Sequence, residues 1–307
     1  MSKQIGKKIK LGRKIGFGSM GEVFLGTFVT DQRTGKHISA AIKRVPASKM
    51  DLKEVTLQSE LSHLPQCNLY VACLYEMKKI GDNYYIVMEY IKGKELFDVL
   101  ANLDHELGLM RLKRLFKQAL EGLAFIHSKG IAHGDIKMEN FMLDEGSHRL
   151  KYIDFGYGCN EKTCKSSPVL HGTGYLDPPE AFKHETVWSK DLSVPKWLSR
   201  YVPPPDSAHT LRSLQRADIW ALGSMFVEML LANENRLDRT VDIGMSGEQL
   251  KDEDSRTWLA SDFLKKKGKL RGRYYDRLYA VIDGMMKLDP DDRITAKQAL
   301  KVLTAKK

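Results

Sequence analysis

Apolar and polar residues alternate in short runs along the first ninety positions of the chain, which is the pattern of β-strands separated by turns. The expected strands cover residues 7–16, 22–29, 37–45, 71–80 and 83–91. One segment breaks this alternation, because Leu57, Leu61 and Leu64 recur at helical spacing within residues 49–64. The pattern therefore predicts a small sheet that carries one helix.

From Glu95 onward the apolar residues recur with a helical period. The clearest helix is expected within residues 112–130, where one face carries Leu112, Leu115, Phe116, Ala119, Leu120 and Leu123. Further helices are expected at 217–231, 274–288 and 295–303, and an irregular loop is expected at Pro203, Pro204 and Pro205. The back of the chain is therefore predicted to be mainly α-helical.

The chain has 307 residues, of which 42% are hydrophobic, so it can form one large domain or two closely joined lobes. The longest apolar stretch, Ala221–Ala232, contains Glu228 and is shorter than the roughly 18 to 20 residues of a membrane span. No apolar signal segment follows the basic N-terminus. We expect a soluble intracellular protein, cytoplasmic or nuclear, without a membrane partner.

The net charge of +10 is compatible with a nucleic-acid partner, an anionic membrane or a basic surface. The basic residues are scattered and form no nucleic-acid-binding motif, so no nucleic-acid partner is expected. The four cysteines, Cys67, Cys73, Cys159 and Cys164, form no CxxC pair and are expected to be free thiols. The short interval between Cys159 and Cys164 leaves a redox switch as the alternative.

Three glycines, Gly16, Gly18 and Gly21, form a GxGxxG motif. Dinucleotide-binding proteins use the same spacing, but there the glycines open a helix, whereas here strand-like residues lie on both sides and Val23 follows. Glycines allow backbone amides to approach phosphates closely. We expect a glycine-rich hairpin over a nucleotide, with an ordinary glycine-bearing hairpin as the alternative.

Lys43 ends the apolar run Ala40-Ala41-Ile42, and Glu54 lies on the predicted front helix. The two can form an ion pair that turns the lysine toward the phosphates, although a surface lysine on a strand is the simpler interpretation.

Residues 133–140, HGDIKMEN, carry the strongest chemical signal. Asp135 is a candidate base, Lys137 a cation for the moving phosphoryl group, and Asn140 a metal ligand. Asp154, the first residue of Asp154-Phe155-Gly156, follows Asp135 by 154 − 135 = 19 residues and is a second metal ligand.

These motifs, in this order along essentially the whole chain, resemble the eukaryotic-type protein kinases. The resemblance implies an α+β fold with a β-rich N-lobe at residues 1–90 and a mainly α C-lobe at 91–307, with the nucleotide between them. It implies ATP and Mg²⁺ as cofactors and protein substrates as partners. The implied nucleotide-contacting residues are Ile15, Gly16, Gly18, Gly21, Val23, Ala41, Lys43, Met88, Glu89, Ile91, Glu95 and Met142.

By the same resemblance, Lys137 and Gly172-Thr173 indicate transfer to serine or threonine hydroxyls. Glu95, Glu139 and Glu228 match acidic residues that, in the cyclic-AMP-dependent kinase and its relatives, receive arginines of the substrate. Arg293 is expected to form a structural ion pair with Glu180, and residues 218–223 to form a buried helix that anchors the catalytic loop.

Three positions depart from the family pattern. Gly134 replaces the usual arginine before Asp135, and Gln58 replaces an apolar residue four positions after Glu54. The interval from Glu180 to Asp218, 218 − 180 = 38 residues, implies an insertion around 183–212, either a surface loop or a docking element. A pseudokinase scaffold and a kinase of small molecules or lipids are the alternative functions.

Overall fold

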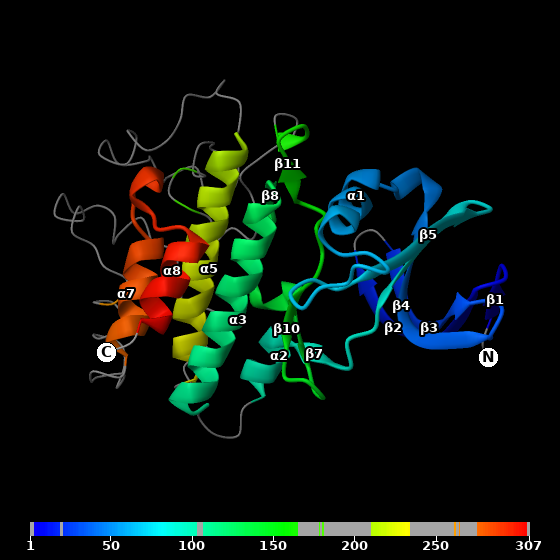
Figure 1. Ribbon diagram of the computed structural model, residues 1–307, viewed down its shortest axis with the longest axis horizontal. Coiled ribbons are helices and arrows are strands. Elements are labelled where there is room, and N and C mark those ends of the chain that lie inside the picture. The colour runs from blue at the N-terminus through cyan, green and yellow to red at the C-terminus, as the bar shows by residue number, and fades with distance from the viewer. Residues whose placement is uncertain are drawn as a thin grey trace, which may run out of the picture. The chain divides into compact units, whose positions relative to one another are not determined.

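The computed structural model describes residues 3–18, 21–102, 107–164, 178, 180, 210–233, 261, 264 and 275–305. The chain divides into two compact units (Figure 1). Unit 1 comprises Met1–Gly93 and Met142–Gly156, and unit 2 comprises Lys94–Phe141 and Tyr157–Lys307.

Unit 1 is built on a six-stranded antiparallel sheet with the order β1-β2-β3-β4-β6-β5. Its strands are β1 (Lys3–Ile5), β2 (Ile9–Gly18), β3 (Gly21–Asp31), β4 (Lys36–Pro46), β5 (Leu74–Ile80) and β6 (Asn83–Glu89). Apolar residues that alternate with polar ones along these strands form one hydrophobic core. Its buried members are Ile5, Ile9, Leu11, Phe28, Ala40, Ile42, Tyr85 and Val87. The five expected strands are present, and β1 is an addition too short for the pattern to reveal.

Helix α1 (Leu52–Leu61) follows a short turn, η1 (Ala47–Lys49), and lies beside this sheet in Figure 1. The Asp51 side chain caps it by accepting a hydrogen bond from the Lys53 backbone N–H. Val55 packs into a second core cluster with Val45, Leu74 and Ile86. The helix is shorter than the expected 49–64 because Asp51 and Ser62 are both extended.

A hairpin completes unit 1, with β9 (Phe141–Asp144), whose first residue belongs to unit 2, paired to β10 (Leu150–Tyr152). The short strand β7 (Gly93–Glu95) lies at the boundary of the two units in the sequence.

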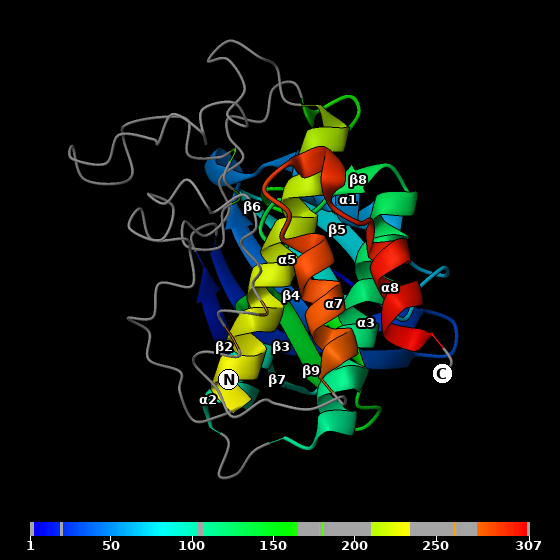
Figure 2. The ribbon, with the colours of Figure 1, turned by 90° about the vertical axis from the view of Figure 1, so that its left-hand side faces the viewer.

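Unit 2 is mainly helical, with α2 (Leu96–Ala101), α3 (Leu109–Ser128), α5 (Leu211–Asn233), α7 (Asp276–Met285) and α8 (Ala296–Thr304). Figure 2 shows α3, α5, α7 and α8 running alongside one another. The expected apolar face of α3 is buried, and Phe116 on it stacks on Phe226 of α5 with ring centroids 3.8 Å apart. The expected α+β fold, with a β-rich part carrying one main helix and a larger helical part, is confirmed.

Short elements shape the loops of unit 2. Strand β8 (Ile131–Ala132) pairs antiparallel with β11 (Cys159–Asn160), and two single turns, η2 (Met138–Asn140) and η7 (Pro290–Asp292), lie elsewhere in the unit. Helix α8 begins with a capping box between Thr295 and Gln298.

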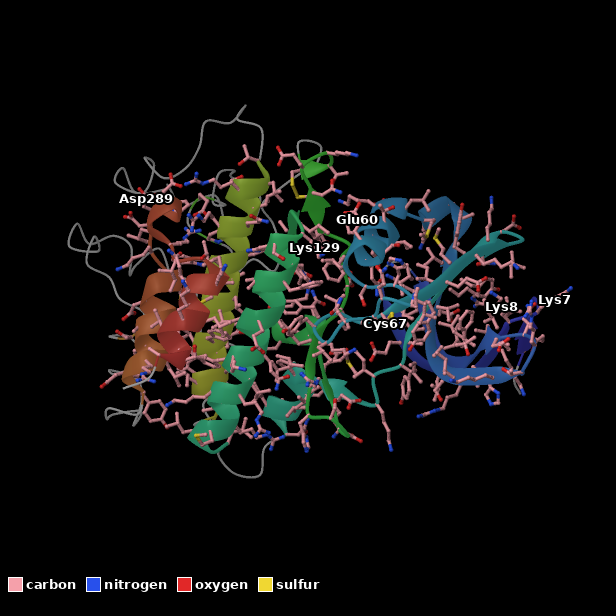
Figure 3. The ribbon with its side chains drawn as sticks, in the orientation of Figure 1. Lys7, Lys8, Glu60, Cys67, Lys129 and Asp289 are labelled. Atoms are coloured by element: carbon pink, nitrogen blue, oxygen red, sulfur yellow. A yellow bond between two sulfur atoms is a disulfide. The ribbon has the colours of Figure 1, made fainter. Side chains whose placement is uncertain are left out.

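The expectation of free cysteines is wrong. Disulfides join Cys67 to Cys73 and Cys159 to Cys164, and Figure 3 labels Cys67. Both segments turn back on themselves, so the paired Cα atoms lie 5.2 and 5.0 Å apart, within the distance that a disulfide spans. Sequence spacing alone does not reveal such turns.

Several expectations fall outside the described residues, namely Gly172-Thr173, Pro203–Pro205 and all but 210–212 of the insertion at 183–212. In the part of the chain that the structure does describe, no helix has the length and apolarity needed to cross a membrane.

The expected ion pair between Arg293 and Glu180 is confirmed. Both guanidinium Nη atoms donate to the Glu180 carboxylate oxygens at 2.6 Å, and the Arg293 side chain is fully buried. Arg293 also donates to the backbone carbonyls of Lys287 and Leu288. One arginine therefore fixes Glu180 against the loop that precedes η7.

Arg293→Ala should lower the free energy of unfolding by about 3 to 5 kcal/mol, because it leaves the Glu180 carboxylate buried without its cation. Urea unfolding at neutral pH measures this loss. The control is Arg212→Ala, which removes an ion pair to Asp291 whose side chains are 72% and 74% exposed. That variant should lose less than about 1 kcal/mol, and equal losses in the two variants would contradict the assignment.

Candidate active site

The expected glycine-rich hairpin is present between β2 and β3. Gly16 pairs with Val23 and Gly18 pairs with Gly21, while Ile15 is 39% exposed. A Cβ atom at Gly21 would lie 2.1 Å from the Arg44 carbonyl oxygen. Close backbone packing therefore requires this glycine, independently of any ligand.

Lys43 and Glu54 form the expected ion pair within unit 1. The Lys43 Nζ atom lies 2.7 Å from Glu54 Oε1 and 3.1 Å from Oε2, and both side chains are largely buried. Burial raises the pKa of Glu54, the Lys43 ammonium opposes this rise, and the negative charges of Asp154 and Asp51 add to it. Asp154 is therefore close enough to Glu54 for their charges to interact.

The strand register places four of the expected nucleotide-contacting residues on one face of the sheet. Lys43 pairs with Val23, and Ala41 pairs with Met88. Directly paired residues share a face, as do residues two apart on one strand. Val23, Ala41, Lys43 and Met88 thus form a surface of three small or apolar side chains around one lysine.

Glu89 and Ile91, in the expected adenine-binding segment, are engaged inside unit 1. The Glu89 carboxylate accepts two hydrogen bonds of 2.7 Å from Lys151 Nζ and one of 3.1 Å from the Cys73 backbone N–H. Ile91 is buried. The Glu89 side chain is therefore a structural anchor.

Asp154 and Met142 are the remaining expected residues of unit 1. Asp154 is exposed and has φ +61°, a conformation that aspartate tolerates better than most residues. Its Oδ1 atom accepts a hydrogen bond from the Gly156 backbone N–H, and Phe155 between them is fully buried. Met142 is half-buried on β9. Burial of Phe155 thus anchors the backbone while the carboxylate faces solvent.

Unit 2 brings Asp135, Lys137 and Asn140 together. Asn140 Nδ2 donates to the Asp135 backbone oxygen at 2.7 Å and to its Oδ2 atom at 2.9 Å. Lys137 Nζ lies 2.7 Å from the same Oδ2 atom. The turn η2 carries Asn140 back toward Asp135, so a carboxylate, a cation and an amide converge over six residues of sequence.

Asp218 on α5 anchors the loop that leads to Asp135. Its carboxylate accepts hydrogen bonds from the backbone N–H groups of His133 and Gly134 at 2.8 and 2.9 Å, and it lies 2.9 Å from His127 Nε2. Residues 218–223 lie in the expected helix, and the Asp218 carboxylate anchors the loop that leads to Asp135.

Gly134 has φ +78°, and a Cβ atom there would lie 2.4 Å from the Tyr157 carbonyl oxygen. Both features require glycine. The departure from the family pattern at this position therefore has a local structural cause.

Four acidic side chains of unit 2, Glu95, Asp98, Glu139 and Glu228, interact electrostatically. Burial raises the pKa of Glu95, and the charges of Asp98 and Glu139 raise it further. Burial together with the charge of Glu139 raises the pKa of Glu228 to about 8. Glu139 thus couples to both of the other glutamates, which places an acidic cluster beside the turn that carries Asn140.

The reasoning from sequence missed two polar contacts in unit 1, namely the Lys151–Glu89 ion pair and a hydrogen bond from Gln58 to the Ala72 carbonyl. The unexpected glutamine at position 58 was the available signal for the second contact. Residue type alone gave no signal for the first.

The grouping of these residues is that of the protein kinases, in which a strand lysine pairs with a helix glutamate and an aspartate, a lysine and an asparagine converge on one loop. A family model described as protein kinase domain matches residues 9–303. The chain therefore belongs to the protein kinase family.

Curated proteins that are similar to this chain are protein kinases. CBL-interacting protein kinase 33 of Oryza sativa subsp. japonica is 32% identical over 217 residues, which cover 65% of this chain and 45% of the relative. Maternal embryonic leucine zipper kinase of Danio rerio is 30% identical over 218 residues, 65% of this chain and 30% of the relative. CBL-interacting serine/threonine-protein kinase 8 of Arabidopsis thaliana is 29% identical over 211 residues, 64% of this chain and 45% of the relative. The matched region spans less than half the length of each of these relatives.

Glu228→Gln should change how stability depends on pH. The pKa of Glu228 is raised from 4.5 to about 8 in the folded protein, so the folded state retains a proton that the unfolded chain releases between these values. Wild-type stability should therefore fall, relative to the variant, as pH rises from 5.5 to 7.5, by on the order of 2 kcal/mol. Urea unfolding at several pH values measures the difference, with the exposed Glu145→Gln as control. Parallel pH profiles of wild type and Glu228→Gln would refute the shift.

Proposed function

We propose that this protein transfers the γ-phosphoryl group of ATP to serine or threonine hydroxyls of proteins, with magnesium as the cofactor. The observation that carries the proposal is the convergence of Lys137 and Asn140 on the Asp135 carboxylate, at 2.7 and 2.9 Å. Asp135 is the base that orients and deprotonates the acceptor hydroxyl. Lys137 compensates the charge that develops on the transferred group.

Lys43 would contact the α- and β-phosphates. An ammonium group on a flexible stem needs a fixed partner to hold one direction, and Glu54 provides it through contacts of 2.7 and 3.1 Å. The low-polarity face around Lys43, formed by Val23, Ala41 and Met88, is suited to the adenine ring.

The chemistry of Asn140 and Asp154 fits magnesium. Both contacts of Asn140 Nδ2 are to acceptors on Asp135, which assigns this atom as the amide nitrogen and leaves the oxygen as the other end of the group. Asp154 adds an exposed carboxylate. Magnesium is commonly held by one or two protein oxygen ligands together with substrate phosphates, and an amide oxygen and a carboxylate are ligands of that kind. Bound there, magnesium would neutralise phosphate charge.

Asp135→Asn and Lys43→Met test the catalytic assignment. Asp135→Asn removes the base and should lower the turnover number about 10² to 10⁴-fold while nucleotide binding is retained. Lys43→Met should also impair transfer, because a thioether cannot contact Glu54 or a phosphate as an ammonium does. Transfer of radiolabelled phosphate from magnesium-ATP to a pool of proteins and metabolites measures the rate and identifies the acceptor class.

The matched controls are Asp82→Asn and Lys10→Met, both at exposed positions. Circular dichroism confirms that each variant is folded. Near-normal turnover in either active-site variant would overturn its assigned role, and labelling of metabolites alone would overturn the protein acceptor.

The acidic cluster of Glu95, Glu139 and Glu228 supports a preference for arginine or lysine before the acceptor residue. A substrate cation beside these glutamates would relieve their mutual repulsion and favour their ionised forms. A positional peptide library should show basic residues enriched upstream of the acceptor in wild type. The enrichment should weaken in Glu139→Gln, since Glu139 interacts with both other glutamates. An acidic preference, or none, would refute this specificity.

A further inference from the structure

Gln58 is a buried polar residue of α1, whose other buried residues are Glu54 and three apolar ones, Val55, Leu57 and Leu61. Its exposed fraction is 3%, and its Nε2 atom donates a hydrogen bond of 3.0 Å to the Ala72 carbonyl oxygen. Gln58 follows Glu54 by four residues in α1, so the two side chains lie on the same face one turn apart. The hydrogen bond therefore acts on the part of α1 that presents Glu54 to Lys43.

The Ala72 carbonyl belongs to a loop that is itself closely held. The Cys67–Cys73 disulfide closes residues 67–73 into a ring. Inside the ring, Asn68 Oδ1 accepts from the backbone N–H groups of Tyr70 and Val71 at 2.8 and 2.9 Å. Asn68 Nδ2 donates to the Leu61 carbonyl at 2.6 Å, which ties the loop to the last residue of α1.

The same loop is bonded to the strand that leads to Asp154. The Ala72 N–H donates to the Tyr152 carbonyl at 3.1 Å, and the Tyr152 N–H donates to the Tyr70 carbonyl at 2.7 Å. Asp154 follows Tyr152 by two residues. The Ala72 carbonyl thus accepts a hydrogen bond from α1, and the Ala72 backbone N–H donates one to β10.

We propose that Gln58 is a positioning residue: its hydrogen bond to Ala72 sets α1, and with it Glu54 and Lys43, in register with the segment that carries Asp154. This role rests on the proposed phosphoryl transfer, in which Lys43 and Asp154 act on the same nucleotide. A leucine or methionine at position 58 would fill the volume but leave the buried Ala72 carbonyl without this donor. The side-chain amide of Gln58 therefore fixes the orientation of α1 relative to Ala72, which apolar packing alone would not do.

The test compares wild type with Gln58→Met, Glu54→Gln and the double variant. Gln58→Met conserves volume and should lower the turnover number about tenfold, in keeping with one buried hydrogen bond. Because Gln58 acts through Glu54, adding Gln58→Met to Glu54→Gln should lower the rate less than about twofold further. Active-site titration corrects each rate for the folded fraction.

The control is Gln298→Met, which removes the glutamine that accepts a hydrogen bond from the Thr295 backbone N–H at the start of α8 in unit 2. It should leave the turnover number within about twofold of wild type and be additive with Glu54→Gln. A full tenfold effect of Gln58→Met in the Glu54→Gln background would show a general structural role and overturn the proposal.

Hydrogen exchange gives a second readout that does not depend on activity. Gln58→Met should accelerate exchange about tenfold or more in peptides that cover 52–61 and 150–156, and Gln298→Met should not. Unchanged exchange in both peptides would overturn the inference. Failure of the proposed function is distinguishable, because a wild-type protein without phosphoryl transfer would refute that function, while the exchange result would still decide the role of Gln58.

Discussion

The Asp218 carboxylate is the contact on which the geometry of the loop that carries Asp135, Lys137 and Asn140 depends. Two consecutive backbone amides, at His133 and Gly134, donate to its two oxygens, and His127 contacts it from α3. Hydrogen bonds from N–H groups to a carboxylate are charge-assisted and are among the stronger hydrogen bonds in proteins. The next residue, Asp135, is consequently held by the backbone while its side chain contacts Lys137 and Asn140.

Buried carboxylates recur throughout the described residues, and their surroundings separate structural from chemical roles. Glu180 has both oxygens paired with one arginine, which is a static arrangement. Glu54 pairs with Lys43. Burial raises the pKa of Glu54, the Lys43 ammonium opposes this rise, and the charge of Asp154 adds to it. Glu228 feels Glu139, a charge of its own sign. The Glu180 pair stabilises the fold, whereas Glu54 and Glu228 are carboxylates whose pKa values are raised by burial.

Much of the architecture followed from sequence patterning because the two periods, two for strands and 3.6 for helices, report burial directly. The apolar face of α3 and the turn between β5 and β6 were predictable in this way. Motif spacing likewise predicted that Asp135, Lys137 and Asn140 come together, since all three lie within one six-residue segment. The two disulfides and the contacts of Gln58 and Lys151 could not be predicted in this way, because each depends on where a loop returns in space. No periodicity along the chain encodes such a return.

The close approach of Gly134 to Tyr157 also limits how this sequence can change. Any residue with a Cβ at position 134 must first have the carbonyl of residue 157 moved out of its way, since the separation would be only 2.4 Å. The two positions are thus epistatic: a substitution at 134 is accessible only after the chain beyond Gly156 has shifted, and that shift must also preserve the pairing of β11 with β8. An arginine introduced at 134 alone would meet a backbone that has no room for it.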